Sequence, residues 1–208
     1  GRSVHILGYF IDHQDPGLLV HLQSLRDARL ARARELVRVL GEGGFTISLD
    51  DVLARSAGGS VGRAHVARAL VEAGLVPTTR AAFDRLIGRG KPYYVAKPVA
   101  SPESVIATIR GAGGLAVLAH PSVSSSEDLI DLLVTQGLAG VEVYHAQHTL
   151  SDRQRLLAIA KRLDLAVTGG SDFHGPGEGR ARLGDGGMTD ALLAAFVDRA
   201  HALGISGS

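Results

Sequence analysis

Three short apolar runs in the second half of the chain end in side chains of the kind that bind metal ions. The runs are residues 114–119, 140–144 and 165–167, and the side chains in question are His120, Glu142 with His145, and Asp172 with His174. Helical patterns separate the runs, which predicts strands of a parallel sheet or a barrel. Function in such folds gathers at the carboxyl ends of the strands. The pattern therefore constrains the fold and the position of the site together.

The last of these runs leads into the segment TGGSDFHG, which places Asp172 and His174 two positions apart. In extended backbone, residues i and i+2 point to the same side, so this pair can direct a carboxylate and an imidazole at one ion. A polar turn in which Asp172 caps the following element is the alternative for this segment alone. Residues 3–10 also have the pattern of a strand, with His5 inside it. Recurrence of the pattern on several strands favours the metal interpretation.

Composition limits the classes of function. The chain has 208 residues, 45% hydrophobic and 21% charged, with a formal net charge of +1, so no large field favours nucleic acid as the main partner. It has no cysteine, which excludes disulfides and thiolate ligands; a metal site must use His, Asp and Glu, a ligand set that suits Mn, Fe, Zn or Mg. No segment has the length and apolarity of a membrane span or the pattern of a signal peptide, and we expect a cytoplasmic protein.

Residues 17–90 differ from the rest because their pattern is helical and rich in arginine. Capping residues and helical spacing predict helices over 18–40, 49–57, 62–73 and 80–87, with Ser48 and Thr78 or Thr79 as N-caps. A short strand is conceivable only at 45–47. From residue 93 onward strands alternate with helices, the first helix opening at Ser101-Pro102. The helical block has the character of an insertion in a β/α barrel.

Five segments together resemble the PHP (polymerase and histidinol phosphatase) metallo-phosphoesterases: VHILGYF, GRAHVARALV, GGLAVLAHP, GVEVYH and TGGSDFHG. The resemblance is greatest to the branch that dephosphorylates nucleotides, including nucleoside 3′,5′-bisphosphates and the ends of short RNA. It implies an α/β fold, a distorted seven-stranded β/α barrel with an inserted helical cap, and two to three divalent metal ions. The implied domains are a barrel strand segment at 1–16, the cap at 17–92 and the C-terminal β/α units at 93–208.

The same resemblance assigns His5, His120, Asp172 and His174 as metal ligands. The family's H-x-H, T-D-H-D and G-I-E motifs, which hold about half of the ligands, do not occur in this sequence. We therefore expect the chain to be the C-terminal portion of a PHP protein, with the N-terminal half of the same barrel as a missing partner. On that expectation these 208 residues alone are inactive.

The implied reaction is phosphoester hydrolysis by a metal-activated water, with Asp172 also orienting the attacking oxygen. Arg63 and His65 at a predicted helix start, and Lys97, are the candidate phosphate-binding residues. His145 and His148 follow a strand end and are candidates for substrate contact or proton transfer, or for plain polar lining. The arginines at 26, 29, 32, 34 and 38 are most simply a solvated helix face, or a stripe that guides a nucleotide strand.

Two other functions remain open at this point. One is a different PHP activity, such as histidinol-phosphate phosphatase, against which the cap sequence argues. The other is a non-catalytic binding or structural module. The preferred partner is a small nucleotide or a short oligonucleotide, and no membrane is expected.

Overall fold

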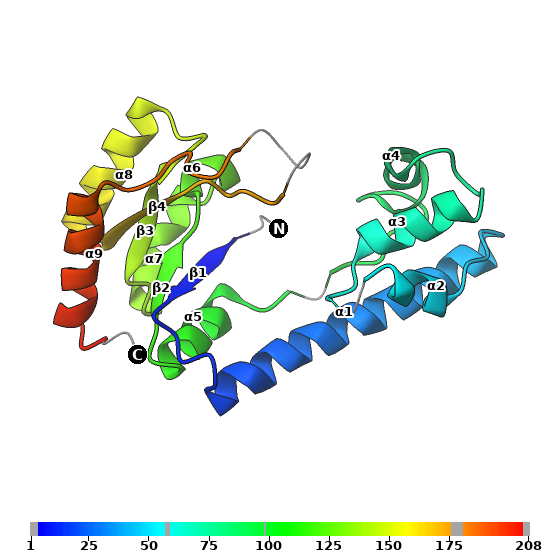
Figure 1. Ribbon diagram of the computed structural model, residues 1–208, viewed down its shortest axis with the longest axis horizontal. Helices are drawn as coiled ribbons and strands as arrows, with labels where there is room; N and C mark the ends of the chain where they lie inside the picture. Colours follow the sequence, from blue (N-terminus) through cyan, green and yellow to red (C-terminus); the bar gives the residue numbers. More distant parts are fainter. Residues whose placement is uncertain (1–3, 57–58, 98, 176–180, 206–208) are drawn as a thin grey trace. The chain divides into compact units, whose positions relative to one another are not determined.

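The computed structural model describes residues 4–56, 59–97, 99–175 and 181–205 (Figure 1). The chain forms two compact units. Residues 1–19 and 100–208 make up the first, here called the sheet unit, and residues 20–99 make up the second, here called the helical unit. The interpretation of the helical unit as the cap of a barrel stays a prediction.

The sheet unit is built on four strands in the order β1-β2-β3-β4. They are β1 (Ile6–Tyr9), β2 (Leu115–Leu118), β3 (Gly140–His145) and β4 (Ala166–Gly170). The strands β2, β3 and β4 are parallel, as predicted, but β1 pairs with β2 in the antiparallel sense. An edge position accommodates such a strand without disturbing the parallel ladder. The described strands form an α/β sheet, and its closure into a barrel stays a prediction.

Helices follow the strands of this unit as the sequence pattern predicts. They are α5 (Pro102–Gly111), α6 (Pro121–Ser124), η2 (Glu127–Leu129), α7 (Ile130–Thr135), α8 (Leu150–Arg162) and α9 (Asp190–Ala202). The predicted start of α5 is confirmed, since Ser101 accepts from the Ser104 N–H and Pro102 is the first helical residue. The single turn α6 was not predicted, because four residues carry too little periodicity to detect.

Alternate residues of β2 serve two cores on opposite faces of the sheet. Ala116 and Leu118 pack with α5, α7 and α8, whereas Leu115 and Val117 pack with Phe196 and Ala200 of α9. Because successive side chains of a strand point to opposite faces, a continuously apolar strand requires helices on both. Tyr9 of β1 adds an edge-to-face contact with Phe196, with ring centroids 5.0 Å apart. The sheet is therefore the middle layer of three. Because helices cover both of its faces, a functional site on the sheet must lie at the ends of its strands.

The helical unit contains α1 (Pro16–Glu42), which begins in the preceding residues, and four shorter helical segments. These are α2 (Leu49–Ala54), α3 (Arg63–Glu72), α4 (Thr79–Ala82) and the π-helical η1 (Phe83–Ile87). The predicted caps Ser48 and Thr78 are confirmed, each accepting a backbone N–H three residues on. The core of the unit has Leu36, Leu40 and Leu70 fully buried.

The prediction of a possible strand at 45–47 was wrong, because the described residues of this unit contain no strand. The Phe45 N–H donates to the Leu40 carbonyl and so closes the end of α1, and the Phe45 ring packs on Tyr93. Apolar side chains at this point serve the core of the unit rather than a sheet. Within the described residues, no helix combines the length and apolarity needed to cross a membrane.

Candidate metal and phosphate site

The carboxyl ends of β2, β3 and β4 lie at one rim of the sheet and carry the predicted site residues. His120 lies two positions after β2, His145 is the last residue of β3, and Asp172 lies two positions after β4. His5 reaches the same rim from the other direction, because it precedes an antiparallel strand. The Ala119 N–H donates to the His5 carbonyl over 3.0 Å, which fixes this register.

His5 and His120 meet at the rim. Nδ1 of His5 lies 3.2 Å from Nε2 of His120, and the rings are edge-to-face with centroids 5.0 Å apart. A separation of this size fits a hydrogen bond between the rings. It equally fits two nitrogen ligands of one ion, because metal–nitrogen bonds of about 2.0–2.1 Å at angles of 90–110° place the nitrogens about 2.9–3.4 Å apart. The pair thus passes a simple geometric test for a shared metal.

Glu142 supports His120 from behind. Its buried carboxylate accepts the His120 backbone N–H at 2.8 Å. The bond holds His120 in a left-handed conformation, with φ 32° and ψ 54°, which a non-glycine residue adopts at a cost. Burial raises the pKa of the Glu142 carboxyl, and the His120 N–H acts in the opposite direction. A lone carboxylate in an apolar strand was the signal in the sequence, although it did not reveal this role.

His145 and His148 extend the imidazole cluster away from His5. The His145 ring lies 5.5 Å from that of His120 and 5.2 Å from that of His148. Nδ1 of His148 donates to the Val143 carbonyl at 2.9 Å, so its Nε2 is an acceptor in the neutral ring. Nδ1 of His145 accepts from the Gln147 N–H at 3.2 Å, so its Nε2 carries the proton. Burial, and then the neighbouring His148 and His120, lower the pKa of His145.

Three ring nitrogens in this cluster are buried and lack a hydrogen-bond partner among the described residues. They are Nδ1 of His120, Nε2 of His145 and Nε2 of His148. Buried polar atoms are almost always satisfied, so these nitrogens are available to further partners: Nε2 of His145 as a donor and Nε2 of His148 as an acceptor. Neutral imidazole nitrogens are the commonest metal ligands in proteins, which suits divalent ions here.

Asp172 and His174 form a second pair with greater exposure. Nδ1 of His174 donates to the Asp172 carbonyl at 2.7 Å and lies 3.6 Å from its carboxylate. The Asp172 charge acts on Glu142 and His145, which places it beside the rim. Over the described parts of the chain, however, no three His, Asp or Glu side chains are grouped so as to hold a metal ion. Convergence of all four predicted ligands therefore stays a prediction.

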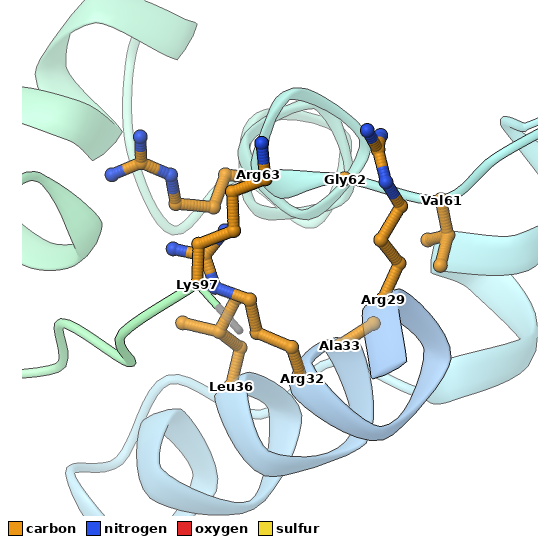
Figure 2. A pocket seen from close by; sticks show the side chains of 8 residues that line it. All are labelled: Arg29, Arg32, Ala33, Leu36, Val61, Gly62, Arg63 and Lys97. Carbon is orange, nitrogen blue, oxygen red and sulfur yellow. The ribbon is translucent and has the colours of Figure 1, made fainter. Parts of the chain in front are cut away.

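The predicted phosphate-binding residues lie in the helical unit, where two of them share a pocket. Arg63 and Lys97 line a cavity of about 190 Å³ together with Arg29 and Arg32 of α1 (Figure 2). The sequence predicted that Arg32 lies on a solvated helix face, and this prediction was wrong. Its guanidinium instead donates hydrogen bonds to the Val95 carbonyl. His65 serves locally: its Nδ1 accepts the Gly62 N–H at 3.0 Å and caps α3.

Imidazole and carboxylate side chains at the carboxyl ends of strands in an α/β unit are typical of metal-dependent hydrolases. The chain is 37% identical over 189 residues to a 3′,5′-nucleoside bisphosphate phosphatase of Chromobacterium violaceum, covering 88% of this chain and 66% of that protein. It is 36% identical to a 5′-3′ exoribonuclease of Haemophilus influenzae, covering 85% of this chain and 66% of that protein.

A crystal structure from Bifidobacterium adolescentis, described as a metal-dependent phosphoesterase, superposes with a TM-score of 0.76 at 37% identity, covering 95% of this chain and 71% of that one. The chain belongs to the phosphoesterase family that these proteins represent. It spans about two thirds of the length of the curated relatives. No family model matches the sequence.

Proposed function

We propose that the full-length protein is a metal-dependent phosphoesterase of the PHP superfamily that hydrolyses phosphate esters of nucleotides. The proposed substrates are nucleoside 3′,5′-bisphosphates and the 5′ ends of short RNA. The observation that carries the proposal is the meeting of His5 and His120 at the strand rim, with Glu142 holding the His120 backbone. Similarity to a bisphosphate phosphatase and an exoribonuclease supports the choice of substrate class.

His5, His120, Asp172 and His174 are the proposed ligands of two or three divalent ions. The 3.2 Å spacing between Nδ1 of His5 and Nε2 of His120 supports a metal at this rim. When bound, such ions supply an activated water at neutral pH and relieve charge on the phosphoryl oxygens. Asp172 combines its ligand role with orientation of the attacking water.

His145 is proposed to donate a hydrogen bond to the reacting phosphate. Its Nδ1 is occupied as an acceptor of the Gln147 N–H, so its Nε2–H is the free donor. Burial lowers the pKa of this ring, which favours the neutral form with its Nε2–H donor. Arg63, His65 and Lys97 are proposed to contact phosphate groups of the substrate.

Metal binding provides the direct test. We expect the full-length His120→Asn variant to bind Mn²⁺ more weakly than wild type. The loss should exceed the roughly 10–100-fold that follows mutation of a residue that only hydrogen-bonds to a metal ligand. His201→Asn, an exposed histidine in α9, is the matched control and should bind normally. Calorimetric titration measures both, and hydrolysis of a nucleoside 3′,5′-bisphosphate should fall in parallel. Equal metal affinity in the two variants would exclude His120 as a ligand.

A further inference from the structure

Four cationic side chains of the helical unit surround one small pocket. Figure 2 shows Arg29 and Arg32 extending from α1, with Arg63 and Lys97 coming from other segments of the unit. The other lining residues that the structure describes are Ala33, Leu36, Val61 and Gly62. Among the described residues that line it, none has an acidic side chain. The pocket therefore combines concentrated positive charge with an apolar wall.

Acidic partners are available in this unit, but they serve other arginines. Arg38 pairs with Glu35 and Glu42, Arg55 with Glu72, and Arg80 with Asp84. Within the residues that the structure describes, none of the four pocket cations has an ion pair. Burial, and then the nearby charge of Arg63, lower the pKa of Arg32. The cations thus repel one another, and a bound anion would relieve that repulsion.

Two of the four cations are held in fixed orientations by neutral groups. Arg32 donates from Nε and Nη2 to the Val95 carbonyl at 3.0 and 2.7 Å. Arg63 donates from Nη1 to the Ile87 carbonyl at 3.3 Å, and its guanidinium carbon lies 5.4 and 5.7 Å from the ring centroids of Phe83 and Tyr94. These contacts fix the guanidinium planes without neutralising their charge. The remaining N–H donors match the forked geometry that phosphate oxygens accept.

The size of the pocket narrows the choice of ligand. At about 190 Å³ it is smaller than the roughly 300–1,000 Å³ of sites that enclose a whole organic ligand. We propose that it is a metal-independent site for a single phosphate group, to which Arg29 and Arg32 contribute as well as Arg63 and Lys97. The phosphate is either the non-reacting phosphate of a nucleotide or free inorganic phosphate. The first of these origins rests on the proposed function, whereas anion binding itself does not.

The test uses inorganic phosphate and pyrophosphate, titrated calorimetrically into the full-length protein in EDTA, so that no metal contributes. We expect Arg29→Gln to weaken binding about tenfold or more, since each charge-assisted contact accounts for that much. Arg29 has no bond to the protein among the contacts of the described residues, so this change leaves the fold intact. Arg34→Gln, an exposed arginine of the same helix, is the matched control and should change affinity less than twofold.

Arg32→Lys provides a second variant, which keeps the charge but loses the fork, and should bind phosphate less tightly than wild type. Unchanged affinity in both Arg29→Gln and Arg32→Lys would overturn the proposal, as would an equal loss in Arg34→Gln.

Steady-state kinetics of the same variants then distinguish a substrate phosphate from free inorganic phosphate. A fall in kcat/KM for a 3′,5′-bisphosphate but not for an aromatic monophosphate indicates a substrate phosphate; unchanged kcat/KM with weaker phosphate inhibition indicates the free ion. Absence of any metal-dependent hydrolysis would refute the proposed function and leave anion binding in EDTA as a separate result.

Discussion

Replacing Glu142 tests whether the buried carboxylate maintains the metal site through the backbone of His120. Glu142→Ala leaves the His120 N–H without its acceptor, now 2.8 Å away, in a buried position. A hydrogen bond to a charged group contributes about 1.5–3 kcal/mol, and the lost buried methylene adds about 0.8 kcal/mol. We therefore expect the free energy of unfolding to fall by roughly 2–4 kcal/mol. Glu142→Gln keeps an acceptor oxygen and removes the cost of burying charge, so its change should stay within about 1 kcal/mol.

Metal affinity gives the functional measure of the same change. Without its acceptor, the left-handed turn at His120 relaxes and the imidazole moves away from His5, so Glu142→Ala should bind Mn²⁺ about 10–100-fold more weakly. Urea unfolding of the metal-free protein and calorimetric Mn²⁺ titration measure the two effects. Wild-type stability and affinity in Glu142→Ala would refute the reasoning. So would equal damage in both variants, because that would assign the effect to charge rather than to the acceptor.

Three further changes have definite expected outcomes. Arg63→Ala should lower kcat/KM for a nucleoside bisphosphate roughly a hundredfold and for a small aromatic phosphate much less, with partial recovery in Arg63→Lys, as steady-state kinetics would show. Hydrogen bonds from Thr149, and then from Arg155, lower the pKa of Asp152 to about 2. Because this is below the unfolded value of about 3.9, the melting temperature of wild type should exceed that of Asp152→Asn at pH 6, and the difference should vanish as the pH falls through 4 toward 2. Gly186→Ala would place a Cβ 2.6 Å from the Gly170 and Tyr144 carbonyl oxygens, at φ +68°, and should destabilise by about 2–4 kcal/mol in urea. Gly184→Ala, at φ +91° in open space, should lose only about 1–2 kcal/mol.

Local signals in the sequence predicted the elements well. Ser48, Thr78 and Ser101 mark helix starts because each cap is decided by a few adjacent residues. The strands were also predicted from a local pattern, because a strand that is covered on both faces is a short run of apolar residues. Candidate ligands could be placed at strand ends for the same reason.

Contacts between residues far apart in the chain could not be predicted from the sequence. Nothing local distinguishes an antiparallel β1 from a parallel one, yet that direction brings His5 to the rim. Arg32 resembles its neighbours on α1, and only the Val95 carbonyl, 63 residues away, separates it from the solvated arginines. Glu142 stood out as polar, but its partner is a backbone N–H, which every sequence position offers. Partners of this kind are set by tertiary packing.

The division of the sheet unit into two stretches of chain has a consequence for the order of folding. β1 must find β2 across a separation of about 110 residues, and closure of so long a loop carries a large entropic cost that is met before the contacts form. The helical unit is continuous in sequence, from 20 to 99, and its contacts are more local. Early formation of this unit would replace most of the loop by a fixed segment before β1 docks. Pulsed amide exchange should then protect α1 and α3 ahead of β1, and the edge strand that carries His5 would be among the last parts to assemble.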